Sequence, residues 1–335
     1  MSRSVLGFMA LMMVTPVAAE GVPAFYGNVD RLVWVVEDLD RTLDQLRNLG
    51  FTDFVDLGAG GMEGTDFRGK PATGGYRVVS GRFGDVPVHW VQPNGGENAF
   101  AEFLKAHGSG VFSLMHRTPN LEAFESEVER MQGLGVNILM GGSIGAQSDP
   151  IRFAFFDTEK KGKYVLGLIY FPDGNEGPLA GPSTNSSGRV VTQYAFAVKE
   201  LEPVSEYWER LGFPAMGFTH GKLSNLKYRR QPADFDMRLG WQRHGEVVYE
   251  WIQSLRGPDV YIDHMKIHGE GFHHLAFGVD NMDKDVAWWT EKGHPESMSG
   301  GWGVEGKPGS GRFAYVDTQA LGGTDVELLW NYPSE

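Results

Sequence analysis

Alternation of bulky and small side chains marks two strand-like stretches, TQYAFAV at residues 192–198 and HHLAFGV at residues 273–279. Successive residues of a strand point to opposite faces of a sheet. The bulky face of each stretch should therefore pack under a helix, while the small face leaves room for a ligand. The small face carries Gln193 in the first stretch and His274 in the second. We expect His273 on the opposite, bulky face.

Short amphipathic segments follow both strands, LEPVSEYWERLG at 201–212 and MDKDVAWWTEKG at 282–293. Their apolar spacing is helical, and a glycine ends each of them. After the first helix come strand-like pieces at 222–230, 235–243 and 247–253. The order of one strand, one helix and about three strands recurs four times. We therefore predict an α+β fold of four βαβββ modules, each an open sheet with a helix on one face.

The chain is also an internal duplication. A His-Gly-x-Gly stretch begins at His107 and again 161 residues later at His268, and other similar segments recur at offsets of 160 and 162 residues. Similarity sustained at nearly one offset is the signature of a repeat. We predict a first half at 28–172 and a second half at 189–332. The Gly/Pro/Ser/Asn-rich residues 173–188 have the composition of a linker.

The formal net charge is −13, and no cluster of Lys and Arg is apparent. Nucleic acids and anionic membranes bind proteins through such clusters, so neither is an expected partner. The chain has no cysteine, which excludes disulfides, thiolate catalysis and cysteine-based zinc sites. We expect a small-molecule substrate and a monomer or homodimer.

The N-terminus has the three regions of an export signal. Arg3 precedes the apolar run VLGFMALMMV, and TPVAAE follows with small residues suited to cleavage after Ala19. The apolar run is too short to span a bilayer. We predict that residues 1–19 are a signal peptide and that the mature protein is periplasmic or secreted.

Two strands each place a glutamate among apolar residues, Glu250 in VVYEWIQ and Glu327 in DVELLW. A buried carboxylate is costly unless it is paired or bound to a cation. Gln193 and His274 occupy the small faces of their strands and can share a site with both carboxylates. These four residues are the candidate site.

Residues 249–283, YEWIQSLRGPDVYIDHMKIHGEGFHHLAFGVDNMD, resemble the vicinal oxygen chelate superfamily, which includes glyoxalase I, methylmalonyl-CoA epimerase and the extradiol dioxygenases. The resemblance extends over nearly all of residues 28–332. It implies paired βαβββ modules around one divalent metal ion, which could be Zn, Ni, Co, Mn or Fe. By that pattern the metal ligands would be Gln193, Glu250, His274 and Glu327, a set similar to that of one form of glyoxalase I.

This ligand set would suit an octahedral dication, because three of its four ligands offer oxygen. A substrate with two adjacent oxygens could chelate the ion, which would stabilise an enediolate once the neighbouring C–H loses its proton. Resemblance to glyoxalase I implies that Glu327 is the catalytic base and that Glu250 lies on the opposite side of the substrate carbon. The expected activity is that of a metal-dependent lyase or isomerase of glyoxalase I or epimerase type.

The first half has Arg31, His89, Ser113 and Gly167 at the equivalent positions, so we predict no metal there. Two alternatives remain open. If the first module pairs with the fourth, Arg31 and His89 would face His274 and Glu327, and two histidines with one carboxylate are the ligands of non-haem iron oxygenases, here of extradiol dioxygenase type. The other alternative is a non-catalytic protein that binds a small ligand.

Three other histidines are interpreted as structural. His116 aligns with Phe277 on the helix-facing side, so it should be a packed histidine. His107 and His268 lie in the His-Gly-x-Gly stretches, where we expect them to stabilise the turn.

Overall fold

The computed structural model describes residues 21–145, 148, 150–172, 179 and 187–332. The predicted signal peptide and most of the predicted linker lie outside these residues. Within these ranges, no helix combines the length and the apolar character needed to cross a bilayer.

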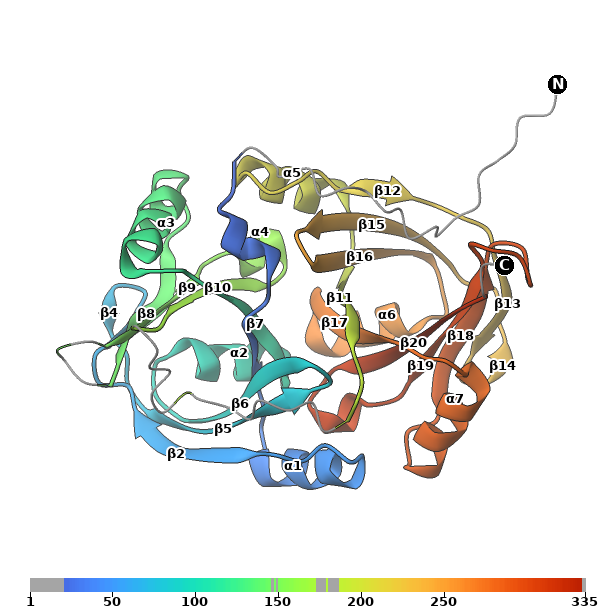
Figure 1. Cartoon of the computed structure of the whole chain (residues 1–335), viewed down its shortest axis with the longest axis horizontal. Coiled ribbons are helices and arrows are strands. Elements are labelled where there is room, and N and C mark those ends of the chain that lie inside the picture. Colours follow the sequence, from blue (N-terminus) through green and yellow to red (C-terminus); the bar gives the residue numbers. More distant parts are fainter. Residues whose placement is uncertain (1–20, 146–147, 149, 173–178, 180–186, 333–335) are drawn as a thin grey trace.

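The described strands form two curled ten-stranded sheets, one from each half of the chain (Figure 1). Their orders are β2-β5-β6-β1-β7-β10-β9-β8-β3-β4 and β12-β15-β16-β11-β17-β20-β19-β18-β13-β14. The first sheet contains β1 (Arg31–Val35), β2 (Val55–Gly61), β3 (Thr65–Phe67), β4 (Lys70–Pro71), β5 (Gly75–Phe83), β6 (Val86–Asn94), β7 (Gly110–Arg117), β8 (Ile138–Ile144), β9 (Ile151–Phe156) and β10 (Val165–Tyr170). The second contains β11 (Val191–Val198), β12 (Gly217–Thr219), β13 (Leu223–Tyr228), β14 (Gln231–Pro232), β15 (Asp236–His244), β16 (Val247–Arg256), β17 (Gly271–Gly278), β18 (Glu296–Trp302), β19 (Gly311–Val316) and β20 (Asp325–Asn331). The equivalent strand orders confirm the predicted duplication.

One helix follows the first strand of every module, as the repeated pattern predicts. These helices are α1 (Leu39–Asn48), α3 (Leu121–Gly133), α5 (Glu202–Arg210) and α7 (Met282–Glu291). Side chains of Asp38, Asn120 and Asn281 cap three of them by accepting a hydrogen bond from a backbone N–H of the first turn. Two further helices, α2 (Ala99–His107) and α6 (Val260–His268), join the two modules of each half. The short α4 (Glu159–Gly162) and the 3₁₀ turns η1 (Ala24–Gly27) and η3 (Gln319–Leu321) complete the fold.

The modules pair within each half. Strand β1 runs antiparallel to β7, and β11 runs antiparallel to β17. The alternative pairing of the first module with the fourth is therefore wrong, because β1 has β6 and β7 as its two neighbours and cannot also pair with β17. Arg31 and His89 belong to the first sheet and do not share a site with His274 and Glu327.

A hairpin exchange between paired modules was not predicted. The short hairpin β3–β4 comes from the first module but pairs with β8 of the second. The equivalent hairpin β13–β14 comes from the third module and pairs with β18 of the fourth. The exchange extends each sheet around its inner face.

Alternate residues of the central strands enter different cores, which confirms the predicted faces of β11. Tyr194, Phe196 and Val198 join one large core that is shared by the two halves and by helices α1, α3, α5 and α7. Ala195 and Ala197 lie instead in a separate core on the inner face of the second sheet. The small side chains thus line the inner face, where the candidate site residues also lie.

The two halves are joined by hydrogen bonds across their common core. His107 Nδ1 lies 2.6 Å from the carbonyl oxygen of His268, and His268 Nδ1 lies 2.7 Å from the carbonyl oxygen of His107. These histidines thus bond to the backbone of the His-Gly-x-Gly stretches, as predicted, but each one bonds to the stretch of the other half. His116 is fully buried and packs edge-on against Tyr26, which confirms it as a packed histidine.

Trp34 gives a test of the junction between the halves. Its indole Nε1 donates to the carbonyl oxygen of Gly322 in the other half at 2.7 Å. Trp34→Phe should leave that buried oxygen unpaired, at a cost of about 1–3 kcal/mol in the free energy of unfolding. Trp90 stacks near Trp34 in the same core, but its Nε1 has no partner in the described part of the chain. In urea titrations Trp34→Phe should thus destabilise more than the matched Trp90→Phe, and equal losses would contradict this role.

Candidate metal centre

Three buried side chains converge on the inner face of the second sheet: Glu250 of β16, His274 of β17 and Glu327 of β20. One ligand atom from each can be chosen so that all lie within 4.8 Å of one another. His274 Nε2 is 3.2 Å from Glu327 Oε2 and 3.5 Å from Glu250 Oε2. The strand register brings them together, because Ala195 on β11 stands opposite both Glu250 and His274.

Gln193, the fourth residue expected from the sequence, lies on the neighbouring strand β11. It pairs in register with Ala276, and Ala276 pairs with Glu327 on the other side. Its amide oxygen Oε1 is buried and has no hydrogen-bond partner among the described residues. A buried polar atom without a partner is costly. The orphaned oxygen therefore fits a site that is completed by a cation.

Burial strongly perturbs the charged groups of this cluster. Glu250 and Glu327 are each only 4 % exposed, and His274 is fully buried. Burial raises the pKa of Glu250 to about 7; the His274 ring opposes this shift, and the Glu327 charge adds to it. Burial alone would lower the pKa of His274, but Glu327 and Glu250 overcome that effect and raise it to about 9. The buried carboxylates thus create a demand for positive charge beside them, which Glu250 can also relieve by taking up a proton.

A divalent ion would meet that demand better than the imidazole can. One imidazolium balances only one of the two carboxylates, whereas a dication balances both and leaves the imidazole neutral, as metal binding requires. Glu250 Oε2 has no well-formed hydrogen bond in the described residues, since 3.5 Å to His274 Nε2 is too long for a good one. The residues present therefore fit a divalent metal ion held by carboxylate, amide and imidazole groups.

His273 does not lie where the sequence predicted. Ala195 pairs with His274, but the next residue, Phe196, pairs with Phe272, so His273 is the extra residue of a β-bulge. The bulge turns its ring away from the bulky face. His273 is fully buried on the inner side, with its Nδ1 2.8 Å from Nδ1 of His274. Both histidines of the pair consequently belong to the site region.

The first half has a cation of its own at the equivalent place. Arg31 is 5 % exposed, and its guanidinium lies 2.9 Å from His89 Nε2 and 2.6 Å from Asp30 Oδ2. Burial and Arg31 together lower the pKa of His89 to about 3, so that ring is neutral and accepts from the guanidinium. A Cβ added at Gly167 would lie 2.7 Å from Ser113 Oγ, which leaves little room for a larger residue. The described part of the first half accordingly contains no comparable group of metal ligands.

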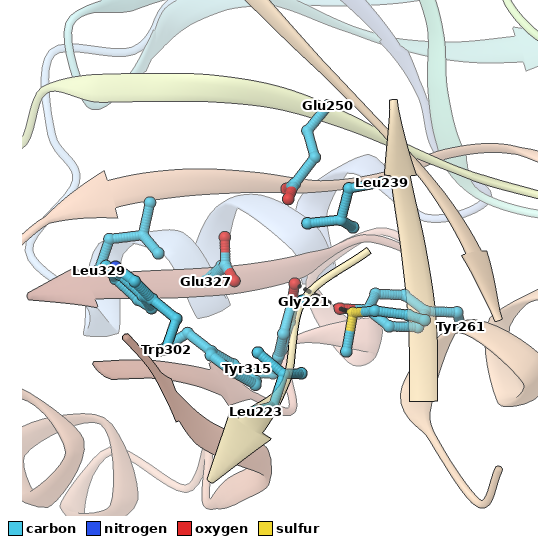
Figure 2. A pocket seen from close by; sticks show the side chains of 11 residues that line it. Gly221, Leu223, Leu239, Glu250, Tyr261, Trp302, Tyr315, Glu327 and Leu329 are labelled. Carbon is cyan, nitrogen blue, oxygen red and sulfur yellow. Dashed lines mark hydrogen bonds between the residues drawn. The ribbon is translucent and has the colours of Figure 1, made fainter. Parts of the chain in front are cut away.

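A pocket opens beside the two carboxylates of the second half (Figure 2). Its cavity volume is about 40 Å³, and it opens to solvent. Figure 2 shows Glu250 and Glu327 approaching it from different strands. The other lining residues are Gly221, Leu223, Met237, Leu239, Tyr261, Trp302, Phe313, Tyr315 and Leu329. None of the described lining residues is Lys or Arg, so the wall around the carboxylates is mainly apolar and aromatic.

Comparison with known proteins gives the same family as the sequence resemblance. The family model of the Glyoxalase/Bleomycin resistance protein/Dioxygenase superfamily matches residues 192–315. None of the curated proteins compared with the chain matches it significantly.

Two solved structures share the fold across both halves. A triple mutant of 4-hydroxymandelate synthase from Streptomyces coelicolor aligns with a TM-score of 0.59 at 16 % identity, over 92 % of this chain and 94 % of that one. A xylose isomerase-like TIM barrel/4-hydroxyphenylpyruvate dioxygenase fusion protein aligns with a TM-score of 0.52 at 14 % identity, over 95 % of this chain and 51 % of that one. Residues 192–315 thus form a domain of the glyoxalase/bleomycin resistance/dioxygenase superfamily, which is the vicinal oxygen chelate superfamily that the sequence resembles, and the first half repeats its fold.

Proposed function

We propose that this chain is a metal-dependent enzyme that moves a proton next to a carbonyl group of a small substrate with two adjacent oxygens. The observation that carries the proposal is the buried group of Glu250, His274 and Glu327, with the unpartnered amide oxygen of Gln193 on the same inner face. Strongly perturbed groups gathered at a pocket are typical of catalytic sites. The reaction is an isomerisation or a lyase reaction of the glyoxalase I or epimerase type.

In this proposal Gln193, Glu250, His274 and Glu327 hold the divalent ion. When bound, the ion supplies a Lewis acid that polarises the carbonyl oxygen and acidifies the neighbouring C–H. Glu327 accepts the proton at a carboxylate oxygen, and Glu250 faces the substrate from the other side of the pocket. The apolar wall excludes water from these carboxylates, which strengthens their interaction with the reacting atoms.

The pocket also limits what the rest of the substrate can be. Leu223, Leu239, Phe313 and Leu329 offer apolar contact, and no described lining side chain offers a positive charge. A phosphate or carboxylate buried here would find no cationic partner, which is costly. We therefore propose a substrate whose chelating oxygens are attached to an uncharged apolar group.

A second candidate is an oxygenase. The fold match to the fusion protein, which contains a 4-hydroxyphenylpyruvate dioxygenase, favours it. The ligand set differs from two histidines and one carboxylate, because Gln193 occupies the position of one histidine. Oxygen consumption with catechols as substrates distinguishes this candidate from the proton-transfer enzyme. Bound metal without either activity would indicate a binding protein.

Metal content is the first test. The purified full chain should bind about one divalent ion. His274→Ala should weaken that binding more than about 100-fold, the upper end for residues that only support a ligand. His89→Gln is the matched control, because His89 holds the position of Glu250 in the first half and Gln keeps an acceptor for Arg31. Metal analysis after dialysis measures both, and equal loss in the two variants would contradict the assignment of the site to the second half.

The role of Glu327 as the base gives a second prediction. Glu327→Gln keeps an oxygen ligand but cannot accept a proton. With 2-hydroxyacetophenone as an apolar probe, exchange of its α-protons with deuterated water should fall roughly 10²- to 10⁴-fold while metal remains bound. Proton NMR measures the exchange. Unchanged exchange in metal-loaded Glu327→Gln would exclude Glu327 as the base.

We also propose that the protein acts outside the cytoplasm, on the basis of Arg3, the apolar run and the small residues before Glu20. N-terminal sequencing of protein recovered from the periplasm or medium should find a start near Glu20. An intact Met1 would refute this proposal.

A further inference from the structure

A file of imidazoles, buried at His274, His273 and His264 and half-buried beyond them, runs from the candidate metal centre to the first half of the chain. It begins with His274, whose Nδ1 lies 2.8 Å from Nδ1 of His273. The ring of His273 packs edge-on against the ring of His264, with 4.9 Å between their centroids. The ring centroids of His264 and His268 are 4.7 Å apart. His268 then reaches the carbonyl oxygen of His107 in the first half. Every link is a direct contact.

The far end of the file is fixed on both sides of the junction. His107 Nε2 lies 2.8 Å from Glu159 Oε1 of the first half. His268 Nε2 lies 3.0 Å from Gln319 Oε1 of the second half. Together with the reciprocal backbone contacts of the two Nδ1 atoms, these bonds leave neither ring free to rotate. Helices α2 and α6 end at these two histidines, so the halves fix the file where they meet.

The contact between His273 and His274 decides which ring nitrogen of His274 can bind a metal ion. Only one proton can lie between the two Nδ1 atoms. If His273 donated it, a neutral His274 would carry its own proton on Nε2 and could not bind an ion there. With His274 as donor, Nε2 keeps its lone pair toward the carboxylates, and His273 carries its proton on Nε2, which lies 3.5 Å from Asp325 Oδ2. The orientation of the His273 ring is therefore what presents His274 Nε2 to a metal ion.

We propose that His264, which is supported by contacts with His268 and His107, positions His273 and through it the metal ligand His274. The first half thereby fixes the geometry of the metal centre. This inference rests on the proposed metal-dependent function. His264 is 4 % exposed, and its Nδ1 has no hydrogen-bond partner in the described residues. Its ring therefore serves at least partly as a packing surface for His273. None of these three histidines is itself a ligand; they are positioning residues.

The test measures Co²⁺ affinity of the full chain by competition with a chelating dye, together with the visible spectrum of bound Co²⁺. His264→Ala should weaken affinity about 10- to 100-fold, as loss of a supporting residue typically does, and should change the spectrum. His264→Phe should restore most of the affinity, because the edge-on contact needs a ring and not its nitrogens. His107→Ala, in the other half, should cause a smaller loss in the same direction.

His116→Ala is the matched control, because His116 is another fully buried histidine that lies outside the file. It should lower thermal stability without changing Co²⁺ affinity or the spectrum. Wild-type affinity in both His264→Ala and His107→Ala would overturn this inference and leave the metal centre standing. Equal affinity loss in His116→Ala and His264→Ala would also overturn it, since general destabilisation would then explain both. A wild-type chain that binds no Co²⁺ would overturn the proposed function and this inference together.

Discussion

Two buried carboxylates beside a single imidazole are the constraint on which the second half depends. Glu250 and Glu327 are buried beside a pocket whose wall is mainly apolar, so nearby groups must supply the positive charge that balances them in place of water. His274 can supply one charge, and its raised pKa shows that the carboxylates hold a proton on it. A dication balances both carboxylates without using that proton. The inner face therefore combines high negative charge with an apolar wall, which suits a chelating head on an apolar substrate.

The first half meets the same constraint with a covalently attached cation. At the place of the amide Gln193 it has Arg31, whose guanidinium bonds to His89 and Asp30 and lies over Phe171. A planar guanidinium satisfies several acceptors at once and keeps its charge at any physiological pH. The remaining space is occupied by an apolar core around Phe112, Phe155 and neighbouring residues. One fold thus carries two kinds of centre, a buried carboxylate–imidazole cluster where we propose a metal ion and a permanent internal salt bridge.

The positions of Gln193, Glu250, His274 and Glu327 could be predicted because they depend on two regular features, strand alternation and the repeat offset. The same features predicted the order of elements. The bulge at His273 could not be predicted, because an extra residue in a strand leaves no mark on the alternation of its neighbours. The exchange of hairpin β13–β14 and the bonds between His107 and His268 arise from pairing between distant segments, which periodicity along the chain does not encode. The pocket residues Phe313 and Tyr315 were missed because both faces of their strand are apolar.

The proposed role of the junction gives the first half a part in the metal centre without ligands of its own. A buried ligand such as His274 needs a fixed ring orientation, and a single bulged strand offers little support for it. The second half supplies part of that support through Tyr315, which packs edge-on against His274. The remainder comes through His273 and His264 from α6, whose last residue is held by the first half. In this proposal a duplicated half without metal ligands can therefore still act on the metal centre, because rigidity at the junction is transmitted by contact and requires no chemistry in the first half itself.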